Sequence, residues 1–150
     1  MVRIRGLIVR QPYASMLARG EKRWEIRRYS TRVRGPVALV SRGLLYGFAE
    51  LIDVFSASIE LLSKYPHMHR VSREELEEYA AGLDVLYVWV FSNPLPLPKP
   101  VKVSYARGAQ VWAFLDMREV LNTLEREGLV REASKVIKLF RKASRWRRWR

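Results

Sequence analysis

Residues 11–15 are Gln-Pro-Tyr-Ala-Ser, and residues 20–27 are Gly-Glu-Lys-Arg-Trp-Glu-Ile-Arg. Proline fits the first turn of a helix, where its missing N–H group costs nothing, so Pro12 predicts that a short helix begins here. Gly20 lies where a residue in the left-handed conformation commonly ends a helix. Beyond it, apolar and charged side chains alternate through 24–27, which is typical of a strand. The two segments therefore predict a helix, a turn and a strand in close succession.

Three charged residues of the second segment have a spacing that predicts a site. Glu25 and Arg27 are two residues apart, so on a strand they share a face and can form a carboxylate–guanidinium pair. Lys22 can join them only if it belongs to the turn after Gly20, and we predict that it does. A lysine held beside such a pair in a cleft would bind a phosphate or a carbonyl group. The alternative is an exposed ladder of ion pairs, which would contribute at most ~1 kcal/mol to stability.

The G-x-K-x-x-E-x-R spacing of Gly20, Lys22, Glu25 and Arg27 resembles the signature of the ASCH domain, a family with a PUA-like β-barrel fold. The segment at 11–15 is similar to the same family, and so is Gly-Phe-Ala-Glu-Leu at 47–51, which matches its central strand. The resemblance spans roughly residues 2–115. It implies a small, mixed, PUA-like β-barrel of the α+β class, with peripheral helices.

The resemblance also implies two classes of function. Most proteins similar to this family are inferred to bind RNA, in a cleft that would here contain Lys22, Glu25 and Arg27. One bacterial branch consists of small amidohydrolases that deacylate a modified cytidine with a lysine, a threonine and a glutamate. Only the lysine carries over, to Lys22, because the threonine position falls at Glu25. A hydrolase acting on an acylated cytidine, with Lys22 and Glu25 as catalytic residues, is therefore the alternative hypothesis, in which Glu25 acts as a base toward water.

The rest of the chain favours the same α+β class. Five further short strands are predicted, and none of the connections between them has the regular βα alternation of a dinucleotide-binding fold. The expected strands are 2–9, 37–41, 48–55, 86–91 and 111–115; the expected helices are 56–64 and 72–81; 65–69 is expected to be a loop, and the proline-rich 92–100 an extended loop or edge. We predict a barrel over 1–116 and a basic helical extension over 117–150, packed on the barrel or projecting from it.

The net charge of +13 is unevenly distributed along the chain. Residues 1–34 carry ten Lys and Arg against two Glu, and residues 141–150 carry six basic residues and no acidic one, whereas 35–140 is close to neutral. This segregation favours a polyanionic partner, with RNA expected and DNA as the alternative. Arg28, Arg32 and Arg34 follow the motif and would contact a phosphate backbone, unless they lie in a solvated loop.

The carboxy-terminal residues form a second candidate binding segment. Arginine supplies phosphate contacts and tryptophan can stack on an unpaired base, so we expect this segment to contact nucleic acid. Two alternatives are that its tryptophans dock on the barrel or that it lies on a membrane surface; a third is a scaffold role in which it binds an acidic protein. The residues are Arg145, Trp146, Arg147, Arg148, Trp149 and Arg150.

Other classes of protein find little support in the sequence. The absence of cysteine excludes a disulfide framework and Cys-ligated zinc. His67 and His69 are the only histidines, so neither a metal site nor a cofactor is expected. No apolar run approaches the ~18 residues of a membrane-spanning helix, and the first residues do not resemble a signal peptide. We therefore expect a cytoplasmic protein without a membrane partner.

Overall fold

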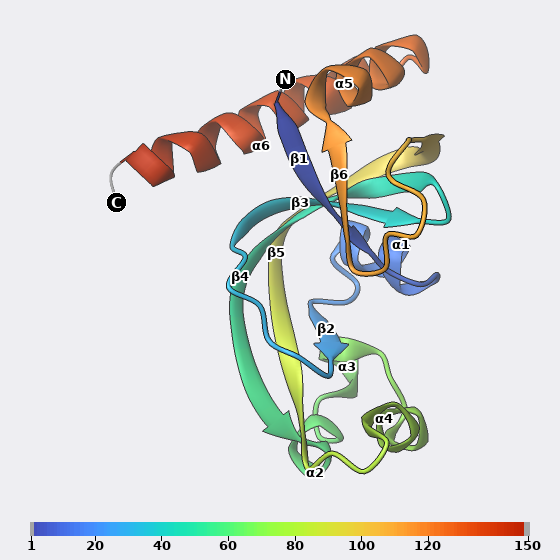
Figure 1. Cartoon of the computed structure of the whole chain (residues 1–150), viewed down its shortest axis with the longest axis vertical. Coiled ribbons are helices and arrows are strands. Elements are labelled where there is room, and N and C mark those ends of the chain that lie inside the picture. Colours follow the sequence, from blue (N-terminus) through green and yellow to red (C-terminus); the bar gives the residue numbers. More distant parts are fainter. Residues whose placement is uncertain (1, 149–150) are drawn as a thin grey trace.

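The computed structural model describes residues 2–148, and for residues 144–148 it describes the backbone only. Figure 1 shows a curved sheet with helices at both ends. The strands are β1 (Arg3–Ile8), β2 (Trp24–Arg27), β3 (Gly35–Ser41), β4 (Leu44–Ser58), β5 (Val85–Lys102) and β6 (Trp112–Asp116). The helices are α1 (Tyr13–Arg19), α2 (Ile59–Leu62), α3 (Pro66–His69), α4 (Arg73–Ala80), α5 (Met117–Arg126) and α6 (Val130–Arg148).

The six strands form one sheet in the order β2-β5-β4-β3-β1-β6. Among the strands of residues 2–148, only the pairing of β1 with β3 is parallel. The predicted α+β class is confirmed, but the sheet is not closed into the expected barrel, since β2 and β6 form its two edges. Side chains bridge the gap instead: Arg27 Nη2 donates to the Ile8 carbonyl at 2.9 Å, and the Trp89 and Trp112 rings stack at 5.8 Å. β2 has only four residues, which leaves little ladder to close a barrel.

The two faces of the sheet pack against different helices. Helices α5 and α6 insert Val120, Leu124 and Val136 into a core with Phe48. Helix α1 packs Leu17 and its neighbours against the opposite face. A third cluster lies between α2, α4 and the far ends of β4 and β5. In Figure 1, α6 crosses the upper end of the sheet and continues beyond it.

Gly47 marks the closest backbone approach in the sheet. A Cβ atom at this position would lie 2.5 Å from the Leu95 carbonyl oxygen and 2.8 Å from the Ala18 Cβ. Only glycine permits such an approach between neighbouring strands and a helix. This approach is what allows α1 to pack directly on β4.

Three local predictions have different outcomes. Helix α4 begins as expected, with Ser72 Oγ accepting from the Glu75 N–H at 3.2 Å. The loop expected at 65–69 is wrong, because Pro66 opens the short helix α3. The proline-rich 92–100 belongs to strand β5, where it pairs only with β4 and the register shifts at several points. An edge with bulges is where a strand tolerates proline.

Candidate functional site

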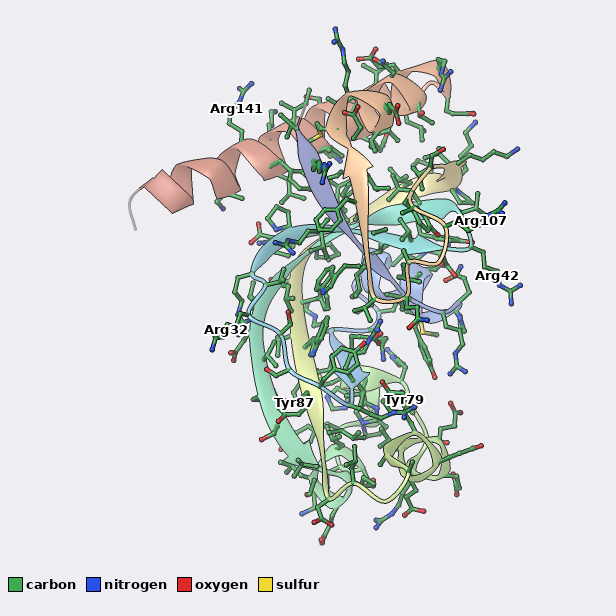
Figure 2. All side chains as sticks on the ribbon, in the orientation of Figure 1. Arg32, Arg42, Tyr79, Tyr87, Arg107 and Arg141 are labelled. Atoms are coloured by element: carbon green, nitrogen blue, oxygen red, sulfur yellow. The ribbon has the colours of Figure 1, made fainter. Side chains whose placement is uncertain are left out.

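A pocket of about 400 Å³ lies between the sheet and helix α4. It occupies the gap where the sheet is left open, between β2 and the end of β1. Tyr79, labelled in Figure 2, lies on the side of α4 that faces the sheet and lines the pocket. The lining residues are Ile8, Val9, Arg10, Tyr13, Lys22, Glu25, Ile26, Arg27, Val71, Glu75, Leu76, Tyr79 and Gln110.

Lys22 lies in the turn that joins α1 to β2. Gly20 ends α1 with φ of 77°, and the Lys22 N–H then donates to the Met16 carbonyl at 3.1 Å. The side chain is 1% exposed, and its Nζ donates to the backbone carbonyl of His69. The same Nζ lies 3.6 Å from Glu25 Oε1 and 4.4 Å from the centre of the Tyr13 ring. The predicted convergence of Lys22 with the strand residues is confirmed.

Glu25 and Arg27 form a buried ion pair on one face of β2. Arg27 donates from Nε to Glu25 Oε2 at 3.0 Å, and its Nη2 lies 2.8 Å from the same oxygen. Glu25 is 6% exposed, so the alternative of a solvated ion-pair ladder is wrong. Arg27 also lies 5.5 Å from the centre of the Trp89 ring. Two cations, Lys22 and Arg27, therefore share one carboxylate beside the pocket.

The pKa values of the two cations shift in opposite directions. Burial lowers the pKa of Lys22 below its ordinary value, and Arg27 adds to this effect while Glu25 opposes it. For Arg27, burial also acts to lower the pKa, but Glu25 and Tyr29 outweigh it and raise the pKa overall. Lys22 is therefore the one cation of this group whose proton is held less firmly than in water.

His69 supports Lys22 from α3. Its Nδ1 accepts from the Val71 N–H at 3.0 Å, so Nε2 carries the proton and donates to the Leu62 carbonyl at 2.7 Å. Burial lowers the pKa of His69, with Lys22 adding to the effect. The neutral ring thus fixes the backbone whose carbonyl binds Lys22. The sequence pointed to His69 only as an incomplete metal ligand and missed this role.

The rim of the pocket joins α1 to α4. Tyr13 donates from its hydroxyl to Glu75 Oε2 at 3.3 Å, and the Arg10 guanidinium lies 5.6 Å from the Tyr13 ring centre. Burial and the Glu75 carboxylate raise the pKa of Tyr13, so the phenol keeps its proton. Sequence analysis missed Arg10, Glu75 and Tyr79 because nothing local connects them. The one usable signal was the helix expected over 72–81, which contains Glu75 and Tyr79.

The arginines after the motif strand do not all reach the pocket. Arg28 lies 4.6 Å from the ring centre of Tyr79. Figure 2 shows Arg32 at the edge of the molecule, pointing outward and away from Tyr79. Arg34 donates to the carbonyls of Thr31 and Val33, at 3.0 and 2.8 Å, and so holds its own loop. The cations of 1–34 are thus only in part gathered around the pocket, because the loop after β2 turns away from it.

The carboxy-terminal candidates fall mostly outside the described residues. The backbone of α6 is helical to Arg148. The side chains of Arg145, Trp146, Arg147 and Arg148, and all of Trp149 and Arg150, lie outside what the structure describes.

Two further observations concern the described part of the chain. It contains no group of three or more His, Cys, Asp or Glu residues arranged to hold a metal ion. Its helices include none with the length and apolar character needed to cross a membrane.

Fold and pocket together define a class: a small α+β domain with a charged, ligand-sized pocket at the opening of a curled sheet. The family model of the ASCH domain matches residues 7–101. The chain belongs to the ASCH domain family. The match contains the whole G-x-K-x-x-E-x-R segment and the pocket residues from α1, β2 and α4.

Solved structures of ASCH proteins from Zymomonas mobilis share this fold. A tyrosine-to-phenylalanine mutant of ZmASCH superposes with a TM-score of 0.66 at 15% identity, covering 81% of this chain and 96% of the other. A serine-to-alanine mutant gives 0.65 at 16% identity, with 81% and 94% covered. ASCH from the same organism gives 0.65 at 16%, with 77% and 90% covered. A comparison with curated protein sequences finds no match.

Proposed function

We propose that this protein binds RNA and that the pocket around Lys22, Glu25 and Arg27 receives one nucleotide of the RNA chain. The observation that carries the proposal is the pocket itself, in which two buried cations face one carboxylate within a volume of about 400 Å³. The inferred RNA binding of ASCH proteins and the net charge of +13 support it.

The polar groups of the pocket suit a base rather than a phosphate. Arg27 occupies Glu25 Oε2, whereas Oε1 lies toward Lys22 and can accept from an exocyclic amine. Lys22 uses one of its three N–H donors on the His69 carbonyl, which leaves donors for a ring nitrogen or a carbonyl oxygen. A phosphate would meet the Glu25 carboxylate at the same place. RNA-binding proteins commonly recognise unstacked bases in this way.

Two arginines at the pocket rim are placed to contact the backbone of such an RNA. Arg10 lies beside Tyr13, and Arg28 lies beside Tyr79, so each guanidinium is held against an aromatic ring. Phosphate contacts of this kind position the nucleic acid, and base contacts in the pocket supply specificity.

The test is a titration of labelled single-stranded RNA, matched DNA and duplex RNA, followed by fluorescence anisotropy. We expect micromolar or tighter binding of RNA at about 50 mM salt, weakening by at least about tenfold at about 200 mM salt. A Lys22→Met variant should lose about tenfold in affinity, because the pocket loses its donors, while Lys64→Met, a control at an exposed lysine, should bind as the wild type does. Absence of RNA binding at low salt would refute the proposal. If Lys22→Met binds RNA as tightly as the wild type, the protein binds RNA elsewhere and the pocket is not the nucleotide site.

A second candidate function is hydrolysis of an acylated cytidine. It is favoured by the burial of Lys22, the lowered pKa of that lysine and the Glu25 carboxylate 3.6 Å away. Glu25 would act as the base toward water, since no threonine occupies its place. Incubation with acylated cytidine and chromatography tests it: product formation that disappears in Lys22→Ala supports it, and no product from the wild type rejects it.

A further inference from the structure

Phe114 is a large apolar side chain on the exposed side of an edge strand. It lies in β6 and is 49% exposed, whereas its neighbours Ala113 and Leu115 are buried in the core beneath α5 and α6. The alternation of β6 therefore turns Phe114 to the opposite face of the sheet, which is the face that carries Trp112. Core packing does not account for an aromatic ring in this position.

Arg5 is held against this ring. It is the direct cross-strand partner of Phe114 in the β1–β6 ladder. Its guanidinium lies 5.6 Å from the Phe114 ring centre and 6.0 Å from that of Trp112. No carboxylate of the described residues pairs with it. Arg5 is thus an exposed cation, oriented by two aromatic rings, with its charge free for an anionic partner.

Packed aromatic rings connect Phe114 and Arg5 to the pocket. Trp112 stacks on Trp89 with an interplanar angle of 17°, and Trp89 lies beneath the Arg27 guanidinium that lines the pocket. Arg5 in β1 is four residues from Val9, which directly follows the strand and lines the pocket. At about 3.3 Å per residue this is about 13 Å, a distance that a short oligonucleotide spans and a single nucleotide does not.

We propose that Phe114 and Arg5 form a second subsite for single-stranded RNA, in which a base stacks on Phe114 and Arg5 contacts the neighbouring phosphate. The inference rests on the proposed function, since the same RNA chain would hold one nucleotide in the pocket and another on β6. Only a single strand offers a free base face to an exposed ring; in a duplex these faces are stacked.

The experiment compares short and long RNA ligands on the wild type and on Phe114→Ala. The probes are a mononucleotide, a single-stranded RNA of about six nucleotides and a duplex RNA, at low salt. Phe114→Ala should weaken binding of the single-stranded RNA about tenfold and leave the mononucleotide and the duplex unchanged. Phe114→Trp should bind the single-stranded RNA as tightly as the wild type does, because the ring is kept. Arg5→Gln should weaken binding of the same RNA. Ile52→Ala removes an equally exposed apolar side chain from β4 and serves as the matched control.

The outcomes separate this inference from the proposed function. If the wild type binds RNA and both Phe114→Ala and Arg5→Gln bind the single strand unchanged, the second subsite is refuted while the pocket stands. If no RNA binds the wild type, both proposals fail. If Phe114→Ala changes the oligomeric state in sedimentation and leaves RNA binding unchanged, β6 is a protein interface and the subsite is likewise refuted.

Discussion

Glu25 is the residue on which the charge balance of the pocket depends. It is the carboxylate that faces both Lys22 and Arg27, and all three side chains are shielded from water. Taking charges out of water is costly, and the cost is recovered only where partners of opposite sign remain. Removing the Glu25 carboxylate should therefore destabilise the protein more than removing the Lys22 cation does.

We expect Glu25→Gln to lower the free energy of unfolding by about 3 kcal/mol, because it leaves two buried cations without their counter-charge. Lys22→Met preserves the Glu25–Arg27 pair and replaces a charged side chain with an apolar one of similar length. It should cost less than about 1 kcal/mol, since relief of the buried charge offsets the donor lost by the His69 carbonyl. Urea denaturation measures both. Equal destabilisation by the two variants would contradict this account of the charges.

His69 should make stability depend on pH in the mildly acidic range. Its pKa in the folded protein lies below the ordinary value of 6.5, because the ring is buried. As the pH falls below 6.5, the unfolded chain takes up a proton that the folded ring does not, so the free energy of unfolding decreases by at most about 1.4 kcal/mol per pH unit. Well above pH 6.5 the His69 ring is neutral in both the folded and the unfolded chain, so the free energy of unfolding carries no penalty from this group.

Urea denaturation between about pH 5 and about pH 7.5 measures this dependence. His69→Gln should flatten the curve over that interval, whereas His67→Gln should keep most of the slope, because burial is the largest cause of the lowered pKa of His69 and the charge of His67 is a smaller one. A curve that keeps its slope in His69→Gln would assign the dependence to another group.

Strand β4, together with β5, supports helix α1 and so fixes the position of the turn that contains Lys22. The strand pairs with β3 on one side and with β5 on the other. Its residue Gly47 lets the backbone of β5 and the side chain of Ala18 approach closely. The turn after α1 then delivers Lys22 to the pocket.

Gly47→Ala should destabilise the protein by more than about 2 kcal/mol, because the added Cβ would lie 2.5 Å from a backbone carbonyl that cannot move freely. Gly6→Ala is the matched control: it lies in β1, and its Cβ would meet neighbours only at 3.6 Å or more. That variant should stay within about 1 kcal/mol of the wild type. Thermal or urea unfolding compares them, and similar losses in the two variants would show that the close approach is not limiting.

The whole molecule carries its positive charge on several sides. Figure 2 shows Arg32 at one edge, Arg42 and Arg107 at the opposite edge, and Arg141 on α6. The net charge of +13 therefore attracts a polyanion from many directions, while the pocket concerns only a few cations. We therefore expect the arginines on several sides of the molecule to determine the affinity at low salt, and the pocket residues to determine which base is bound.

The carboxy-terminal arginines should contribute to the salt dependence of RNA binding. Replacing all four with glutamine should reduce the slope of log affinity against log salt by up to about 3, since each phosphate contact to a single strand contributes about 0.7. Arg42→Gln with Arg107→Gln is the control on another side of the molecule and should leave the slope nearly unchanged. If the variant with all four arginines replaced keeps the slope of the wild type, the carboxy-terminal arginines do not contact the RNA. The four positions are Arg145, Arg147, Arg148 and Arg150.

Much of the local structure was predictable because it depends on neighbours in the chain. Alternation of apolar and charged side chains predicted β2, the helix expected over 72–81 corresponds to α4, and Gly20 marked the end of α1. The spacing of Lys22, Glu25 and Arg27 predicted their convergence, since a turn followed by a strand brings them to one side.

By itself the amino-acid sequence determined the α+β class, the family, the motif at 20–27 and the segregation of charge along the chain. Only the tertiary structure decided that the sheet stays open, that Glu75 lines the pocket while His69 holds Lys22, and that Arg5 lies against Phe114. The reason is physical. Periodicity and caps act within a few residues, whereas Lys22 meets a carbonyl 47 residues away through the packing of whole elements. Strand order and curvature set such contacts, and no local pattern encodes them.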